Sequence, residues 1–239
     1  MKTEATINSH VISASIVALG LVLAGVCLRS GIVKFKQLDR VVSVKGLAER
    51  EVKADKVTWP LTYKELGNDP SVMYSTLEAK NAKVVAFLKS AGIKDDEISI
   101  NPPLISDRQA DNYGNEIMNY RYKATSVITV TSANVDKVRQ LMRRTAELMK
   151  QGIAIVGGDY GDSTVSYEFT KLNSIKPAMV EEATKNARST AEKFAADSDS
   201  KIGGIRTATQ GQFSIDDRDA NTPYIKRVRV VSTIEYTLE

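Results

Sequence analysis

The sequence predicts an α+β fold of duplicated strand–helix–strand–strand units, with helices packed on mainly antiparallel sheets after one N-terminal transmembrane helix. Three observations lead to this prediction. Residues 11–28 carry no charged side chain, strand-like and helix-like patterns alternate after them, and one order of elements occurs twice. The single cysteine excludes an intramolecular disulfide framework, so a packed core must stabilise the folded part.

The first expected element is a membrane anchor at residues 11–28, between a short tail (1–10) and a linker (29–39). Eighteen helical residues rise about 27 Å, close to the roughly 30 Å hydrocarbon core of a bilayer. An uncleaved anchor is favoured over a cleaved signal, because the start is weakly basic and no Ala-x-Ala site follows. A buried core helix is disfavoured because the run is apolar on all faces.

The first copy of the repeat is expected at residues 57–131, after a short strand at 41–45. Apolar and polar residues alternate from Val57 to Tyr63, which predicts a strand with one buried face, and Pro60 requires an edge position or a bulge there. A helix follows, because Asp69 is a suitable N-cap, Pro70 suits the first helical position and Gly92 ends the apolar spacing. Strands at 98–105 and 118–130 flank a polar loop.

A helix at 134–151 joins this copy to the second one, expected at residues 165–238. A strand at 165–169 precedes a helix that opens near Pro177, and strands at 205–215 and 228–238 complete the copy. One face of that helix is expected to pack on a sheet through Val180, Ala183, Ala187, Ala191 and Phe194. The two copies share a proline at the helix start and a similar acidic loop before the last strand.

The residue content argues against familiar catalytic chemistry. After Cys27 the chain contains no histidine and no cysteine, which removes the most common zinc ligands, general bases and thiolate nucleophiles. Asp217-x-Asp219-x-Asn221 has the opening spacing of a calcium loop, but Thr222 stands where the loop needs glycine, and Val228 where it needs glutamate. Solvated turn residues are the default interpretation. We therefore expect no catalytic, cofactor-binding or metal-binding residues.

The charge distribution gives no sign of a nucleic-acid partner. The formal net charge is +4, and basic and acidic residues are interspersed along the chain. A nucleic-acid-binding surface usually carries a stronger basic stripe with interleaved aromatic residues. Exposed, solvated charges are the simpler interpretation.

Several segments resemble SIMPL-domain proteins, in the same order along the chain. They are the opening strands (42–48 and 52–57), the end of the first long helix (87–93) with 98–99 after it, the central strand (122–127), and the alanine-rich helix (182–195) with 202–203 after it. The resemblance covers about residues 40–238 and implies a SIMPL-like domain at 40–239. It also implies a bacterial envelope protein, usually periplasmic or surface-associated, without established catalytic residues. Relatives include one that assembles into ring-like oligomers and others loosely linked to oxidative stress.

The resulting expectation is a non-enzymatic protein held in the inner membrane by one helix, with a periplasmic domain that forms homo-oligomers and a possible role in envelope or oxidative stress. Four basic residues follow the apolar run before residue 41, whereas Lys2 precedes it, and this imbalance favours the opposite orientation. Two alternatives therefore stay open. One is a cytoplasm-facing binding module, and the other is an envelope hydrolase that uses carboxylates or a serine–lysine pair.

Overall fold

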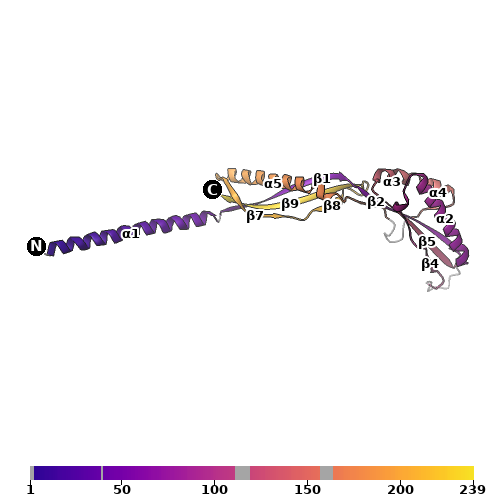
Figure 1. The fold of residues 1–239 in the computed structure, drawn as a ribbon, viewed down its shortest axis with the longest axis horizontal. Coiled ribbons are helices and arrows are strands. Elements are labelled where there is room, and N and C mark those ends of the chain that lie inside the picture. Colours follow the sequence, from indigo (N-terminus) through magenta and orange to yellow (C-terminus); the bar gives the residue numbers. More distant parts are fainter. Residues whose placement is uncertain (1–2, 39, 111–118, 157–163) are drawn as a thin grey trace. The chain divides into compact units, whose positions relative to one another are not determined.

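The computed structural model describes residues 3–38, 40–110, 119–156 and 164–239 (Figure 1). These residues form two compact units. Unit 1 comprises Met1–Glu49, Ile175–Ser214 and Arg229–Glu239, and unit 2 comprises Arg50–Ser174 and Ile215–Val228. The helices and two antiparallel sheets confirm the predicted α+β class.

Helix α1 (Thr3–Leu38) is continuous over 36 residues. Within it, Ala14–Val33 is long and apolar enough to cross a membrane, and none of this stretch is buried. The span overlaps the predicted run, and the helix continues through residues 29–38, the segment suggested as a linker. A 20-residue helix rises about 30 Å, the thickness of a bilayer core.

Unit 2 is built on a five-stranded antiparallel sheet with the order β3-β5-β2-β6, and β4 also pairs with β5. Its strands are β2 (Lys56–Gly67), β3 (Ile98–Ile100), β4 (Leu104–Asp107), β5 (Tyr122–Ser132) and β6 (Ser166–Glu168). The register places Leu61 beside Ile128 and Trp59 beside Val130, so these apolar residues share one face. Pro60 lies between the β6 pairing, which ends at Thr58, and a bridge at Thr62. No described strand faces Pro60 on that side, which agrees with the predicted edge position.

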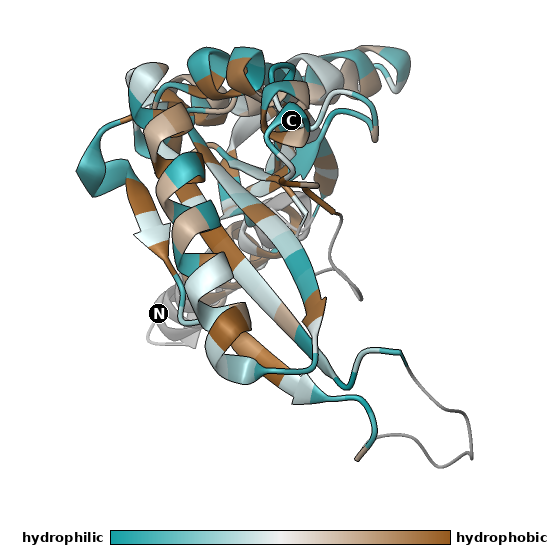
Figure 2. Cartoon of the chain, turned by 90° about the vertical axis from the view of Figure 1, so that its right-hand side faces the viewer, coloured by the Kyte–Doolittle hydropathy of each residue, from teal (hydrophilic) through white to brown (hydrophobic). Residues whose placement is uncertain are grey.

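Helices cover the apolar face of this sheet (Figure 2). They are α2 (Pro70–Ser90), α3 (Val135–Met142) and α4 (Ala146–Lys150), and the short helix η1 (Asp95–Glu97) precedes β3. The predicted caps of α2 are confirmed, because the Asp69 carboxylate accepts hydrogen bonds from two backbone amides of the first turn and Gly92 has a φ of 78°.

The helix predicted at 134–151 is two helices, not one. Residues 143–145 form a turn between α3 and α4, in which the Arg143 amide bonds to the Gln140 carbonyl. The Thr145 hydroxyl also donates to the Met142 carbonyl at 2.9 Å. A threonine hydroxyl that competes for a backbone carbonyl favours such a break.

Most of helix α5 (Leu172–Asp197) belongs to unit 1 and packs on a four-stranded sheet with the order β1-β9-β7, in which β8 also pairs with β9 (Figure 1). The strands are β1 (Val41–Lys53), β7 (Ile202–Gln210), β8 (Ser214–Asp217) and β9 (Ile225–Leu238). The buried stripe of α5 consists of Met179, Ala183, Ala187, Ala191 and Ala195. These small residues let the helix approach β1 closely at Gly46.

Two expectations about α5 are wrong. Pro177 lies inside the helix, which begins five residues earlier, and Phe194 is 58% exposed instead of buried. Pro177 removes one backbone donor from the second turn, and the helix still begins earlier, where the Asp55 carboxylate accepts hydrogen bonds from the Thr170 and Lys171 amides just before its first residue. The buried stripe advances by four residues per step and drifts around the helix, so Phe194 points away from the sheet at the last turn.

The two sheets repeat one topology, with an unexpected first strand in the second copy. In the five-stranded sheet, β2 lies beside β5, and β3 and β4 both pair with the other side of β5. In the four-stranded sheet, β1 lies beside β9, and β7 and β8 both pair with β9. Strand β1 therefore takes the position expected for residues 165–169. The strand within that segment, β6, pairs with β2 instead.

The third strand is interrupted in both copies, where the sequence suggested one strand each at 98–105 and 205–215. Residues 101–103 separate β3 from β4, and residues 211–213 separate β7 from β8. From Ile100 to Leu104 the chain advances four residues while its partner β5 advances three, which is a β-bulge. Most of the loop that follows β4 lies outside the described residues, as does Met118, the first residue of the strand expected at 118–130. Residues 119–121 are described but are not part of a strand, so β5 begins later than expected, at Tyr122.

Candidate functional site

A groove of about 870 Å³ opens between α2 and the bulged edge of the five-stranded sheet. Its lining comes from α2 (Tyr74, Leu77, Glu78, Asn81, Ala82 and Val85) and from the edge (Ile100, Asn101, Pro102, Pro103 and Ile105). Ile100 and Tyr74 are 53% and 51% exposed. Most of the lining is apolar, and Glu78 is its single charged residue. This combination is typical of a binding surface.

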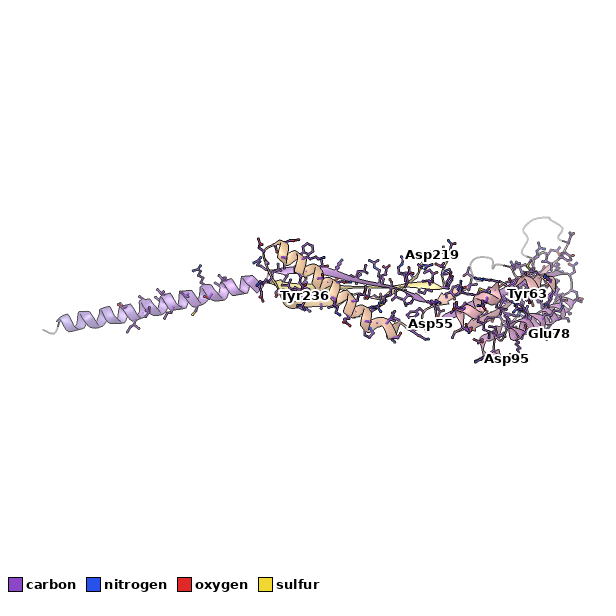
Figure 3. The ribbon with its side chains drawn as sticks, turned by 90° about the horizontal axis from the view of Figure 1, so that it is seen from above. Asp55, Tyr63, Glu78, Asp95, Asp219 and Tyr236 are labelled. Atoms are coloured by element: carbon purple, nitrogen blue, oxygen red, sulfur yellow. The ribbon has the colours of Figure 1, made fainter. Side chains whose placement is uncertain are left out.

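The floor beside the groove is held by a network of polar side chains from three elements. The Tyr63 hydroxyl lies 3.1 Å from the Leu77 carbonyl and 2.8 Å from the Asn81 Oδ1, and the Ser126 hydroxyl donates to the same Oδ1 at 2.9 Å. Burial raises the pKa of Tyr63 above its usual value. The phenol therefore stays protonated and acts as a hydrogen-bond donor, not as a nucleophile. Figure 3 labels Tyr63 and Glu78 in this part of the molecule.

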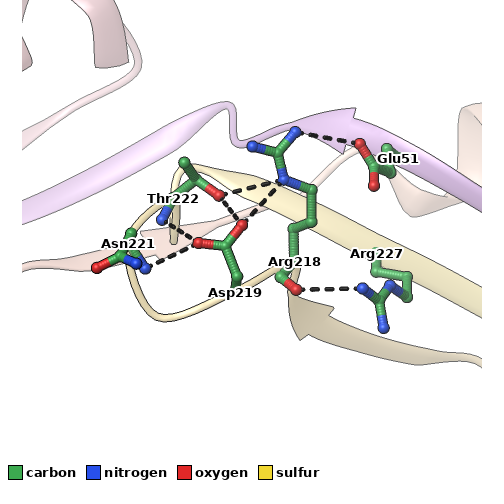
Figure 4. Close-up of polar contacts among 6 residues, drawn as sticks. All are labelled: Glu51, Arg218, Asp219, Asn221, Thr222 and Arg227. Carbon is green, nitrogen blue, oxygen red and sulfur yellow. Dashed lines mark hydrogen bonds and ion pairs between the residues drawn. The ribbon is translucent and has the colours of Figure 1, made fainter.

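The acidic loop before β9 is a tightly bonded turn (Figure 4). The Asp219 carboxylate accepts hydrogen bonds from the backbone amides of Asn221 and Thr222 at 2.8 Å each, and also from the Thr222 hydroxyl and Arg218 Nε. These bonds, the one from the Thr222 hydroxyl above all, lower the pKa of Asp219 to about 2. Arg218 also pairs with Glu51 at 3.3 Å. The carboxylate oxygens of Asp219 thus shape the turn.

The matching loop before β5 uses the same construction. The Arg108 amide donates to the Arg121 carbonyl at 2.8 Å, as the Arg218 amide donates to the Ile225 carbonyl at 2.9 Å. Asp107 pairs with Arg121 at 2.7 Å, and this guanidinium holds the pKa of Asp107 below its usual range. In the second copy, Asp217 pairs with the Lys226 ammonium instead. The two hairpins therefore support the internal repeat.

The comparison with known families settles the relationship. A family model described as SIMPL, a protein of unknown function (DUF541), matches residues 42–234. The chain belongs to the SIMPL family. The match confirms the resemblance inferred from the ordered segments and spans both units. None of the curated proteins compared with the chain matches it.

The SIMPL domain shows no constellation for familiar catalysis where the structure describes it. Across residues 3–38, 40–110, 119–156 and 164–239, no three acidic, histidine or cysteine residues group as a metal site. Cys27 is exposed on α1. The groove between α2 and the edge offers apolar contact, one carboxylate and two amides, which can bind a ligand but provide no nucleophile paired with a base.

Sequence reasoning missed the groove. Within the sequence, Asn81 and Ser126 are ordinary helix and strand residues, and no local pattern shows that the Ser126 and Tyr63 hydroxyls both donate to the Asn81 side-chain oxygen. One signal was present. Two consecutive prolines at 102–103, inside an apolar strand pattern, indicate an interrupted edge strand.

Proposed function

We propose that this SIMPL protein is a non-enzymatic envelope protein, anchored in the inner membrane by α1, that associates with copies of itself on the periplasmic side. The observation that supports membrane anchoring is the exposed, apolar surface of α1. Every side chain from Ala14 to Val33 is exposed, and Arg29, near the end of the stretch, is its single charged residue. Apolar surface of this extent is not stable in water, and a bilayer is the environment that matches its length.

A binding role is better supported than a catalytic one. The folded part contains no histidine or cysteine, and the described groove presents an apolar lining around Glu78, Asn81 and Asn101. The periplasmic placement comes from the family resemblance, against the flanking positive charges. A role in envelope or oxidative stress has the same source, and growth of a deletion strain under peroxide tests it.

Membrane anchoring is tested by fractionating cells that produce the full chain and washing the membranes with alkaline carbonate. We expect the wild type in the washed membranes. Leu21→Arg combined with Val22→Arg should release it, because each arginine at mid-membrane costs about 3 kcal/mol of insertion. Thr3→Arg is the matched control and should leave the protein in the washed membranes. Recovery of the wild type in the aqueous fraction with Met1 still attached contradicts the proposal.

Orientation is tested by adding protease to spheroplasts. A periplasmic domain is digested in intact spheroplasts, whereas a cytoplasm-facing module is digested only after lysis. The second result would replace the proposed placement by the alternative that the flanking charges favour.

Self-association is tested on the full chain in non-ionic detergent, by size-exclusion chromatography with light scattering corrected for bound detergent. We expect a protein mass of two or more chains at micromolar concentration. A strictly monomeric mass across the concentration range contradicts this part of the proposal and leaves the anchoring intact.

A further inference from the structure

Strand β7 is an open edge. It lies at one end of the order β1-β9-β7, so one side of its backbone has no neighbouring strand in the part of the chain that the structure describes. The strand is nine residues long and contains no proline, and every residue from Gly204 to Gln210 is exposed. Such an edge presents unpaired amides and carbonyls that can pair with another strand.

The other sheet ends are shortened, interrupted or covered. In the five-stranded sheet, β6 has three residues, and Pro102 and Pro103 interrupt the opposite edge between β3 and β4. At the β1 end of the four-stranded sheet, the Asn186 side-chain amide donates to the Leu47 carbonyl at 2.8 Å. These are usual devices that prevent edge-to-edge pairing. In β7 the register is shifted only before Thr207, and from Thr207 to Gln210 the strand pairs regularly with β9 and offers an uninterrupted edge.

The register shows which backbone groups of β7 face the open side. The Gly211 amide donates to the Val231 carbonyl at 2.8 Å, and the pairing Thr209–Thr233 continues the same register. In an antiparallel ladder, directly opposed residues alternate between bonded and non-bonded pairs. Thr207 and Thr209 therefore bond to β9, while the backbone groups of Ala208 and Gln210 point away from it.

The side chains of β7 make the edge complementary to itself. In an antiparallel arrangement centred on Ala208, this alanine faces Ala208 of a second copy and Thr207 faces Thr209, all within the regular part of β7. Arg206, at the register shift, comes near Gln210 of the second copy. Arg206 is the single charged residue of the strand, and this register keeps it away from its own copy.

We infer that β7 is the self-association surface, and that two copies join their four-stranded sheets through antiparallel β7–β7 pairing centred on Ala208. The inference rests on the proposed self-association and names its surface. Such an interface is isologous, because a two-fold axis passes through its centre. The backbone hydrogen bonds between the two β7 strands hold the copies together, and the opposed threonines favour this register over shifted ones.

The first experiment uses the full chain in detergent and compares Ala208→Pro with Ala208→Val. Proline removes an amide that faces the open side and leaves the bonds to β9 from its neighbours, whereas valine keeps the amide and suits a strand. We expect the dissociation constant to rise at least tenfold for Ala208→Pro and to stay within about twofold for Ala208→Val. Far-ultraviolet circular dichroism shows whether either variant is folded.

The second experiment does not depend on the proline variant. Thr207→Cys and Thr209→Cys are each placed in a Cys27→Ser background and are produced alone or together. The proposed register brings Cα atoms at these positions to about 4.5 Å across the interface, within reach of a disulfide. Mild oxidation should cross-link the two variants produced together, and neither alone.

The outcomes separate the inference from the proposed function. Three results together support both the proposed self-association and the β7 surface: the wild type assembles, Ala208→Pro weakens the assembly, and the two cysteine variants cross-link when they are produced together. If the wild type assembles but Ala208→Pro does not weaken the assembly and the two cysteine variants do not cross-link, the β7 surface is overturned and self-association stands. If the proline variant is unfolded, the cross-link alone decides. A monomeric wild type overturns both.

Discussion

Substitution of Gly46 by alanine tests whether the close approach of α5 to β1 stabilises unit 1. An ideal Cβ on Gly46 would lie 1.8 Å from the Ala183 carbonyl oxygen and 2.5 Å from the Ala187 amide nitrogen. Both are backbone atoms of a helix, so neither can rotate away as a flexible side chain would. The helix itself must move.

The size of the effect follows from these distances. Ordinary contact begins near 3.4 Å, so the Ala183 carbonyl oxygen has to retreat by about 1.6 Å. A gap of that size removes most of the dispersion contact along the buried alanine stripe, and overpacked cores lose about 1–3 kcal/mol. Gly→Ala also stabilises by about 0.4–1 kcal/mol through the unfolded chain. Because the clash is with backbone atoms, the upper end of the first range applies, and we expect a net loss of about 2 kcal/mol.

Hydrogen exchange of the full chain in detergent, followed by mass spectrometry, measures this loss within α5. A loss of about 2 kcal/mol makes sub-global exchange of the α5 amides about thirtyfold faster. Gly204→Ala is the matched control, because a Cβ there meets nothing within 4 Å. Equal α5 exchange in Gly46→Ala and Gly204→Ala would refute the reasoning, since it would mean that the helix does not pack on β1 at this distance.

Three further predictions concern hydrogen bonds. Tyr63→Phe should lower the free energy of unfolding by about 1 kcal/mol in urea denaturation, whereas Tyr74→Phe, at the exposed groove wall, should change it little. The Asp219 carboxyl should titrate near pH 2 in carbon-detected NMR. Its stabilising effect is therefore present above pH 3.8, the ordinary pKa of an aspartate, and is lost as the pH falls towards 2. Thr222→Val should raise the pKa of Asp219, whereas an ordinary pKa in the wild type would contradict the hydrogen bonds to its carboxylate. Asp69→Ala should destabilise α2 by about 1 kcal/mol through loss of its N-cap, which faster amide exchange in the first turn would reveal.

Local patterns predicted the parts of the fold that local chemistry determines. The alternation from Val57 to Tyr63 placed the buried face of β2 correctly, because every second residue of a strand points to the same side. The N-cap Asp69 and the positive φ of Gly92 fixed both ends of α2 for equally local reasons. The order of recurring elements revealed the repeat before any strand pairing was known.

Non-local contacts account for the errors. The start of α5 could not be found from Pro177, because the carboxylate that receives the preceding amides belongs to Asp55, 115 residues away from Thr170. The exposure of Phe194 depends on how the helix crosses its sheet, which spacing along one helix does not determine. The groove likewise depends on a bulge and on hydroxyls from separate elements.

The repeat also explains why the two copies offer different surfaces. In the first copy, large side chains such as Trp59 and Leu77 fill the space between helix and sheet, and the bulged third strand lies beside α2 to form the groove. In the second copy, alanines bring α5 down onto β1 and β9, and the helix leaves β7 uncovered. The copy whose helix carries large side chains on its buried face thus has a groove beside the helix, whereas the copy with small side chains has an exposed strand edge.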